Sequence, residues 1–538
     1  MRFALPAALL AAISLASVSV AQTADQPDFT AEGFRSHVAF LSDDLLEGRD
    51  AGTRGYDIAA RYVATQFEGL GLKPGNGGSW YQEVPFGDYR VAEGSTLTIG
   101  GKAFPHNGDI LLYPGADAQL SLEAPVVFAG YGLDAPERGF NDYAGLDVKG
   151  KIVAVLSGYP KGTASDVGAH LTSEKGLMAQ KNGAVGMITI RNSAEMKRRS
   201  WNAVKANASH GNITWSENGK PYSAAPNIRF SATLDQSAAE DLFAGARTPL
   251  KTVLAQADKA GGKPKGFALK PSVKVEQQTT AKTFSSPNVL AVLPGSDPAL
   301  ANEYVLLMAH LDHVGTDPSI QGDQIHNGAM DNATGIATLI EVAEAMAASP
   351  NRPKRPILFA AVTAEEDGLR GSQFLAKHPV LGNGKVVGVV NLDMPVLTYD
   401  FQDVIAFGAE HSTMGQAVAR AGASMGVKLI DDPLPQEGLF TRSDHYRFVQ
   451  EGIPSVFLMT GFGGEGQERF MHFLQNDYHK PSDEIDLPFN WQAGAKFARI
   501  NYLIAREIAD GAEAPRWYRG SFFGDVFAKD QPKAAPVK

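Results

Sequence analysis

Five polar clusters between positions 310 and 479 combine side chains that could form a two-metal hydrolytic site. Their segments read AHLDHVG, GAMDNATG, VTAEEDG, VNLDMP and DYHKPSDE, with the candidate residues His310, Asp312, Asp331, Glu365, Glu366, Asp393 and His479. Each cluster stands at the end of an apolar, strand-like run, where α/β folds build their sites. The donors are imidazole nitrogen and carboxylate oxygen, a set that suits Zn²⁺, with Co²⁺ or Mn²⁺ as substitutes.

The first two clusters suggest a metal ligand with a supporting acid. His310 and Asp312 are two residues apart, so on a strand their side chains face the same way. A histidine beside a carboxylate is the arrangement of a ligand whose tautomer an acid holds. His313 faces the other way, as a packing or hydrogen-bonding residue. Asp331 precedes a predicted helix, where it could cap the helix or bridge two cations.

The next clusters place buried charge at strand ends. Glu365 and Glu366 end the apolar run PILFAAVTA, where two acids would repel each other without a cation nearby. Because adjacent side chains diverge, one could bind metal while the other acts as general base on water. Asp393 ends VVGVVNLD, which is too apolar to be exposed, so its charge needs a partner. His479 alone would be taken for a surface residue.

Alternating strands and helices from Ser286 onward must position these side chains. Strands are predicted at 288–294, 304–310, 356–363, 386–393, 403–408 and 454–459, and helices at about 333–347, 369–377, 412–425, 442–451 and 490–510. This alternation predicts an α/β fold with a mixed, mostly parallel sheet sandwiched by helices. The glycine-rich stretch 460–470 is predicted to line the pocket or act as a lid, or else to be an ordinary surface loop.

Changes in residue pattern along the chain predict one α/β domain interrupted by an insert. Residues 29–72 have the apolar spacing of two helices, whereas short β-rich runs with frequent glycine begin near residue 95. The α/β domain is expected to comprise residues 22–110 and 281–515, with a β-rich insert at 111–280. Residues 516–538 form a C-terminal tail, whose last residues, KDQPKAAPVK, lack a core-forming pattern and are predicted to be disordered.

Composition restricts the partners and the compartment. A formal net charge of −10 argues against a nucleic-acid partner. Residues 1–21 have the pattern of a signal peptide with cleavage near Ala21, and no segment is long and apolar enough to span a membrane. The chain contains no cysteine, whereas large exported animal proteins usually carry disulfides. We therefore expect export to a bacterial periplasm or the extracellular medium, and we predict no oligomeric state.

The motifs resemble those of a known family, the M28 metallopeptidases, which is the zinc aminopeptidase and glutamate carboxypeptidase group. The resemblance rests on the ordered motifs H-x-D, G-A-x-D-N-x-x-G, EEDGLRGS, N-L-D-M and Y-H-x-x-x-D. Residues 35–86 are similar to the N-terminal segment of bacterial members. The middle, especially VVFAGYGLDAPERGFNDYAGLDVKGKIVAVLSG, is similar to the protease-associated (PA) domain inserted in many of them. The resemblance implies a zinc-exopeptidase-like fold with an inserted PA-like domain.

The resemblance also implies a role for each site residue. His310 and Asp393 would hold one of two zinc ions, Glu366 and His479 the other, and Asp331 would bridge them. Glu365 would be the general base, and Asp312 the acid that supports His310. The peptide bond between Asp331 and Asn332 would be cis. Tyr478 would stabilise the oxyanion, with Tyr446 as a competing candidate. The family's first motif usually reads H-x-D-S or a close variant, whereas here it reads His-Leu-Asp-His, so the role of His313 stays open.

The expected function is an exported di-zinc aminopeptidase that hydrolyses peptide bonds at peptide or protein N-termini. A metal-bridged water would be activated by the glutamate base. A carboxypeptidase would need an arginine cluster, for which Arg442 and Arg469 are candidates. Glutaminyl cyclase, a relative with one zinc, and a non-catalytic binding protein of the same fold are alternatives. The PA-like insert could bind partners, cover the site or select substrates by size.

Overall fold

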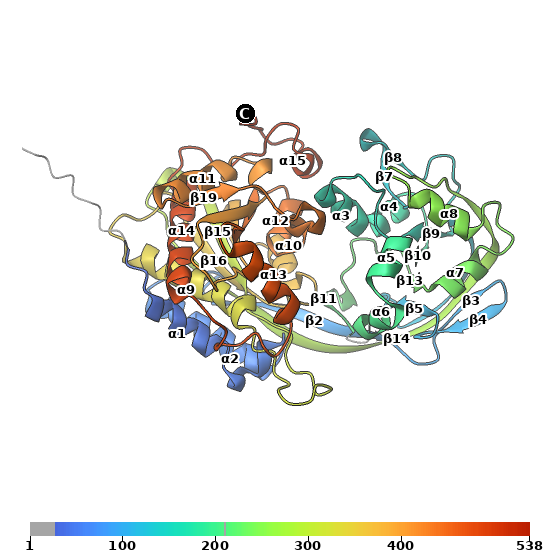
Figure 1. Cartoon of the computed structure of the whole chain (residues 1–538), viewed down its shortest axis with the longest axis horizontal. Helices are drawn as coiled ribbons and strands as arrows, with labels where there is room; N and C mark the ends of the chain where they lie inside the picture. Colours follow the sequence, from blue (N-terminus) through green and yellow to red (C-terminus); the bar gives the residue numbers. More distant parts are fainter. Residues whose placement is uncertain (1–26, 209–210, 538) are drawn as a thin grey trace, which may run out of the picture.

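The computed structural model describes residues 27–208 and 211–537, and it consists of two lobes joined by long strands (Figure 1). The predicted signal peptide at 1–21 lies outside the described residues. One lobe is the α/β domain and the other is the insert. No helix among the described residues is long and apolar enough to cross a membrane.

The α/β domain is built on a mixed sheet with a parallel centre. β15 (Glu303–His310) lies between β16 (Ile357–Val362) and β17 (Lys385–Leu392) and is parallel to both; β17 is also parallel to β20 (Ser455–Thr460). Antiparallel strands flank this centre: β14 (Phe267–Leu293) beside β16, and β18 (Asp403–Phe407) beside β20. The predicted mixed, mostly parallel sheet is therefore confirmed for the centre of this domain.

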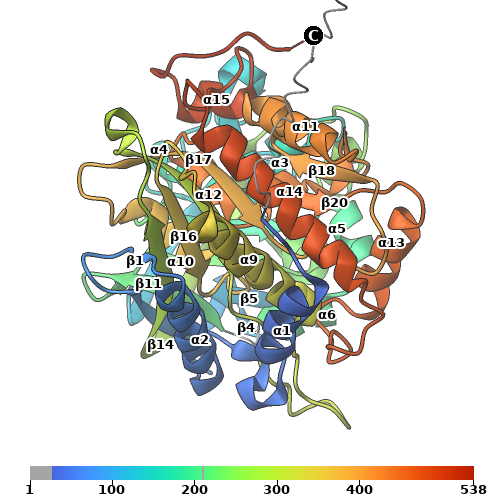
Figure 2. The ribbon, with the colours of Figure 1, turned by 90° about the vertical axis from the view of Figure 1, so that its left-hand side faces the viewer.

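Helices cover both faces of this sheet, because its strands are apolar on both sides. α1 (Ala31–Leu41), α2 (Arg54–Gly69), α9 (Thr334–Ala348) and α14 (Trp491–Ala509) lie together on one face (Figure 2). α10 (Arg370–Lys377) and α12 (His445–Gln450) cover the other face. Along β15, Leu306 and Met308 pack on the face covered by α10 and α12, whereas Leu307 packs in the main core on the other face. This alternation is the period of two expected for a strand.

The insert has its own sheet, and that sheet begins earlier than predicted. β3 (Thr96–Ile99) pairs with β14 and with β4 (Lys102–Pro105), and β14 also pairs there with β6 (Gln119–Phe128). β3 and β4 thus belong to the sheet of the insert, although they precede its predicted start at residue 111. Its other strands are β5 (Ile110–Tyr113), β9 (Ile152–Leu156), β10 (Gly186–Ile190) and β13 (Ser231–Leu234).

One pair of long strands joins the two lobes. β14 pairs with β6 of the insert over residues 267–278, and with β2 (Tyr81–Val91) over residues 279–289. The predicted boundary at 280/281 thus falls inside a continuous strand. β11 (Asn212–Glu217), which lies within the predicted insert, also pairs with β2. Trp215 of β11 is buried against α10, and its indole N–H donates to the Gln373 side chain at 3.0 Å.

The C-terminal segment packs on the α/β domain. α15 (Phe522–Phe527) contributes Phe523, which is fully buried, and the Trp517 ring before it is buried as well. The amide of Ala534 donates to the Trp517 carbonyl, and the amide of Arg519 donates to the Ala534 carbonyl, both at 2.9 Å. The prediction of a disordered end is therefore wrong as far as Ala534, because backbone hydrogen bonds hold the segment up to that residue.

Not every element of the α/β domain was predicted. α13 (Gly466–Asn476) begins inside the stretch 460–470, for which only a loop was expected. β19 (Lys428–Ile430) is a short edge strand parallel to β18. The start of α13 was not predicted because three glycines between residues 461 and 464 are typical of a loop. In the structure two of them, Gly461 and Gly463, approach the side chain of Asp403 so closely that a Cβ would collide with it.

Candidate active site

The ends of three neighbouring strands bring the predicted site residues together. His310 is the last residue of β15, Asp393 follows β17, and Glu365 and Glu366 follow β16. These strands are parallel, so their carboxyl ends share one edge of the sheet. Asp331 lies in the turn before α9, and His479 in the loop after α13.

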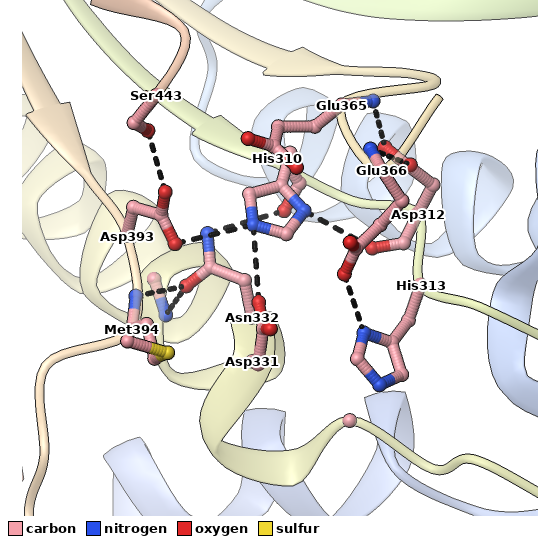
Figure 3. Close-up of polar contacts among 12 residues, drawn as sticks. His310, Asp312, His313, Asp331, Asn332, Glu365, Glu366, Asp393, Met394 and Ser443 are labelled. Atoms are coloured by element: carbon pink, nitrogen blue, oxygen red, sulfur yellow. Dashed lines mark hydrogen bonds and ion pairs between the residues drawn. The ribbon is translucent and has the colours of Figure 1, made fainter. Parts of the chain in front are cut away.

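The five predicted metal ligands form two groups joined by Asp331, and Figure 3 shows the first of these, in which His310 lies between Asp393 and Asp331. In the first, His310 Nε2 lies 3.2 Å from Asp393 Oδ1 and 3.3 Å from Asp331 Oδ1. In the second, His479 Nε2 lies 3.1 Å from Glu366 Oε2 and 3.2 Å from Asp331 Oδ2. Each oxygen of Asp331 therefore faces a different histidine, which is the arrangement of a bridging carboxylate.

The spacing of these donors fits zinc. Two ligands on one tetrahedral zinc ion, each about 2.0–2.1 Å from it, stand about 3.3 Å apart. The four distances above are all close to that value. Moreover, His479 Nε2 is buried and has no aligned hydrogen bond to any residue that the structure describes, despite its two carboxylate neighbours. A buried nitrogen without a hydrogen bond, facing two carboxylate oxygens, is suited to donate its lone pair to a cation.

Burial perturbs the acids of the site in opposite directions. Burial raises the pKa of Glu365 well above its ordinary value, and the charges of Glu366 and Asp393 add to this effect. Burial alone would do the same to Asp331, but the imidazoles of His310 and His479, 3.3 and 3.2 Å from its two oxygens, hold its pKa well below the ordinary value. Glu365 thus has a high proton affinity, as a general base requires, whereas Asp331 stays ionised.

Asp312 does not support His310 in the way predicted. Its carboxylate accepts hydrogen bonds from the backbone amides of Glu365 and Glu366, at 3.1 and 3.2 Å. His310 Nδ1 instead bonds to the backbone carbonyl of Asp312, at 3.1 Å. The two residues are two apart in the chain, so the turn after β15 brings the carbonyl to the imidazole. The Asp312 carboxylate therefore positions the two glutamates, and its main-chain oxygen orients the histidine.

The peptide bond between Asp331 and Asn332 is cis, as the resemblance implied. The side chain of Asn332 then ties the turn to the end of β17. Its Oδ1 accepts from the amides of Gly335 and Met394, at 3.0 and 3.1 Å, and its amide donates to the Leu392 carbonyl at 2.9 Å. These contacts hold the loops that carry Asp331 and Asp393 against each other.

Two supporting residues were not assigned a role from sequence. Asp483 is fully buried, and its carboxylate accepts from the amides of Met330 and Asp331, at 2.8 and 3.0 Å. It is the last residue of the Y-H-x-x-x-D motif, so its place in that motif was the available signal. Arg49 is also buried, and its guanidinium donates to the carbonyls of Leu311 at 3.0 Å and Gly328 at 3.1 Å.

The two candidate tyrosines lie in different places. Tyr478 lines the cavity at the site, and its ring lies against that of His479, with centroids 3.9 Å apart. Tyr446 is buried at the contact with the insert, where its hydroxyl lies 2.7 Å from His170 Nδ1. Of the two candidate arginines, Arg442 lines the cavity. Arg469, on α13, instead pairs with Glu465, the residue before that helix, at 2.8 Å.

The cavity at the site has a volume of about 290 Å³ and is largely apolar away from the donors. Its floor contains His310, Asp331, Glu365, Glu366 and Asp393. Its apolar lining consists of Met394, Leu434, Leu439, Phe457, Met459, Phe470 and Leu474. Phe470 and Leu474 come from α13, so the glycine-rich stretch leads into a helix that forms part of the cavity wall.

Comparison with known proteins matches both lobes. Residues 288–505 match the model of peptidase family M28, and residues 122–224 match that of the PA domain. The leupeptin-inactivating enzyme 1 of Streptomyces exfoliatus is 31% identical over 48% of this chain and 57% of its own length. The chain thus spans little more than half of that relative.

Two further proteins match nearly the whole chain. The probable lipoprotein aminopeptidase LpqL of Mycobacterium tuberculosis is 24% identical, over 89% of this chain and 85% of its own length. The solved structure of the aminopeptidase from Aneurinibacillus sp. strain AM-1 covers 95% of this chain and 98% of its own, with 21% identity and a TM-score of 0.50. The similarity to this solved structure supports a fold shared by the two proteins.

Proposed function

Because the chain combines a domain of peptidase family M28 with a PA domain, we propose that it is a di-zinc aminopeptidase. The observation that carries this proposal is the carboxylate of Asp331, whose oxygens face His310 at 3.3 Å and His479 at 3.2 Å. A carboxylate shared between two such groups serves two cations better than one.

The five donors divide between two zinc ions. His310 and Asp393 would hold the first ion, Glu366 and His479 the second, and Asp331 would bridge them. When bound, zinc supplies Lewis acidity toward water and toward the carbonyl of the scissile bond. Co²⁺ or Mn²⁺ would fit the same nitrogen and oxygen donors.

Proton transfer falls to Glu365. Its carboxyl group lines the cavity beside the donors, and burial raises its pKa. It takes a proton from the attacking water and returns it to the departing amine. Tyr478, which lines the same cavity, donates its hydroxyl proton in a hydrogen bond to the oxyanion that forms at the carbonyl.

The charges of the cavity favour a substrate with a free ammonium group. Glu437 lines the cavity in addition to the acids of the floor, and Arg442 is the one lining arginine among the described residues. Arg442 also has Glu437 as a neighbour, at 3.9 Å. A carboxypeptidase would need more positive charge to hold a free carboxylate. Removal of N-terminal residues is therefore the favoured reaction.

The apolar lining indicates which N-terminal residues are accepted. Leu434, Leu439, Met459 and Phe470 surround the cavity, and each is an apolar side chain. Burying a Leu, Met or Phe side chain there is favourable by about 1.5–3 kcal/mol relative to leaving it in water. We therefore propose a preference for large apolar N-terminal residues.

The test is hydrolysis of aminoacyl-nitroanilides and of matched N-blocked peptides by the purified protein, with and without chelator. Chelator-sensitive cleavage of the free-amine substrates alone is the expected result. Cleavage confined to N-blocked peptides would overturn the aminopeptidase assignment. Metal analysis of the same sample should give two zinc ions per chain; one ion would favour cyclase-like chemistry, and none would favour a binding protein.

We also propose that the protein is exported. The support is the signal-like pattern of residues 1–21 and the absence of cysteine from the chain. The expected result is a mature N-terminus near residue 22 in protein recovered from the periplasm or the medium. Recovery of the full-length chain from the cytoplasm would contradict export.

A further inference from the structure

Two carboxylates beside Asp331, those of Asp393 and Glu366, each contact other side chains through both of their oxygens. Asp393 faces His310 through Oδ1, while its Oδ2 accepts from the Ser443 hydroxyl at 2.5 Å. Glu366 faces His479 through Oε2, while its Oε1 lies 2.9 Å from His313 Nδ1. Each carboxylate therefore has one oxygen toward the metal position and the other on a second side chain (Figure 3).

The contact between His313 and Glu366 is a hydrogen bond rather than a shared ion. Its 2.9 Å is a typical hydrogen-bond length and is shorter than the separation of about 3.3 Å expected for two ligands on one zinc. An ionised carboxylate only accepts hydrogen bonds, so Nδ1 must carry the proton. Nε2 of His313 is buried and has no hydrogen-bond partner among the described residues.

The fold leaves the imidazole of His313 little freedom. The side chain is fully buried, and its ring meets that of His479 edge to face, with centroids 5.5 Å apart. Gly328 lies against the ring with φ +58°, and a Cβ there would be 2.6 Å from His313 Cγ and Cδ2. The absence of a side chain at Gly328 therefore makes room for the ring.

We propose that His313 and Ser443 are paired positioning residues, one for each zinc ion, and that His313 fixes Glu366 so that Oε2 is presented to the metal. This inference rests on the proposed di-zinc function. It assigns the open position in His-Leu-Asp-His, where the family usually has serine. Hydrogen bonds to ligating side chains typically contribute 10–100-fold in metal affinity, because they fix the orientation of the ligand.

The first experiment compares His313→Asn with His313→Gln in the full chain, with zinc affinity measured by competition against a chelator. The amide nitrogen of asparagine can occupy the position of Nδ1, whereas that of glutamine reaches toward Nε2. We expect His313→Asn to bind both ions within about threefold of the wild type. His313→Gln should weaken one ion about 10–100-fold. Far-ultraviolet circular dichroism and thermal melting establish that each variant is folded.

The second experiment identifies which ion each residue serves. In a His479→Ala background only the group of His310, Asp331 and Asp393 remains complete. There, adding Ser443→Ala should weaken the remaining ion about 10–100-fold. Adding His313→Gln should leave its affinity unchanged within about twofold.

Two results would overturn the proposal. In the first, Asn and Gln at position 313 weaken zinc equally, which would make the ring a packing element. In the second, His313→Gln weakens the remaining ion in the His479→Ala background as much as Ser443→Ala does. Failure of the proposed function would look different, because the wild-type chain would then bind fewer than two zinc ions.

Discussion

The hydroxyl of Tyr446 lies 2.7 Å from Nδ1 of His170, and both side chains are buried where the α/β domain meets the insert. Phe522, Phe523 and Phe527 of the C-terminal segment surround the same imidazole. Burial lowers the pKa of His170 to about 4, so its ring is neutral at pH 7. Tyr446 therefore connects the two lobes and does not belong to the catalytic cavity.

We expect Tyr446→Phe to reduce stability without reducing turnover. The substitution leaves a buried imidazole nitrogen without its partner, which costs about 1–3 kcal/mol. The measurements are the free energy of unfolding in urea and kcat on a leucyl-nitroanilide. A fall in kcat of tenfold or more at unchanged metal content would place this tyrosine in the reaction after all.

Tyr478→Phe, in contrast, should reduce turnover without reducing stability. Tyr478 lines the cavity next to His479, so loss of its hydroxyl removes the donor proposed for the oxyanion. Loss of one such donor reduces kcat by about 10²–10³-fold. The KM and the thermal midpoint should change little, since the ring packing remains. An unchanged kcat would exclude Tyr478 from this role.

The substitutions Glu365→Gln and Glu366→Gln should distinguish the general base from the metal ligand, although the two residues are adjacent. Glu365→Gln should retain two zinc ions and lose about 10²–10⁴-fold in kcat, because the base is removed while the donor set remains. Glu366→Gln should retain only one ion, because Glu366 is the residue that faces His479, at 3.1 Å. Metal analysis and kinetics on the same samples decide the matter, and loss of zinc from Glu365→Gln would contradict the assignment.

Phe470→Ala should change the substrate preference. Phe470 lines the cavity from α13, so its truncation removes apolar surface that a large N-terminal side chain would contact. We expect kcat/KM for leucyl and phenylalanyl substrates to fall about tenfold relative to the alanyl substrate. Met471 is on the same helix and does not line the cavity, so Met471→Ala is the matched control. Equal loss on all three substrates would argue against a side-chain pocket here.

The stability of the protein should rise with pH above neutrality because of Lys175. Its ammonium group is buried in the insert and donates to the Leu156 carbonyl at 2.7 Å. Burial lowers its pKa from 10.5 to about 7, so between these values the unfolded chain binds more protons than the folded one. Folding is therefore favoured as pH rises through that window, by at most about 1.4 kcal/mol per pH unit.

Urea unfolding of the wild type and of Lys175→Met at pH 6.5–9.5 provides the measurement. The difference in unfolding free energy between the two proteins should vary with pH over this range, because the methionine cannot titrate. A constant difference would show that Lys175 does not release its proton in the folded state.

Most of the α/β domain could be predicted from periodicity. The strands at 304–310, 356–363, 386–393 and 454–459 match β15, β16, β17 and β20 within one or two residues. Their runs are apolar throughout because both faces are covered, and this signal is strong in the sequence. α13 was missed because its first turn follows several glycines, and a glycine-rich run predicts a loop.

The C-terminal boundary of the insert could not be predicted because no change in residue pattern marks it. β14 continues through residue 280 as one strand, and only its partner changes, from β6 to β2. Likewise β3 and β4 pair in the sheet of the insert although they precede its predicted start, since a short strand carries no information about which sheet it joins. Strand pairing depends on the three-dimensional path of the chain and not on local pattern.

The sequence by itself determined which side chains could bind metal, since their types and their positions at strand ends are local properties. The tertiary structure decided which atoms meet. It brought the Asp312 carbonyl rather than its carboxylate to His310, joined His313 to Glu366, and took Tyr446 to the insert. The physical reason is that a hydrogen bond requires a donor–acceptor distance within a few tenths of an ångström and a nearly linear angle at the hydrogen. Packing between segments far apart in the chain sets both the distance and the angle.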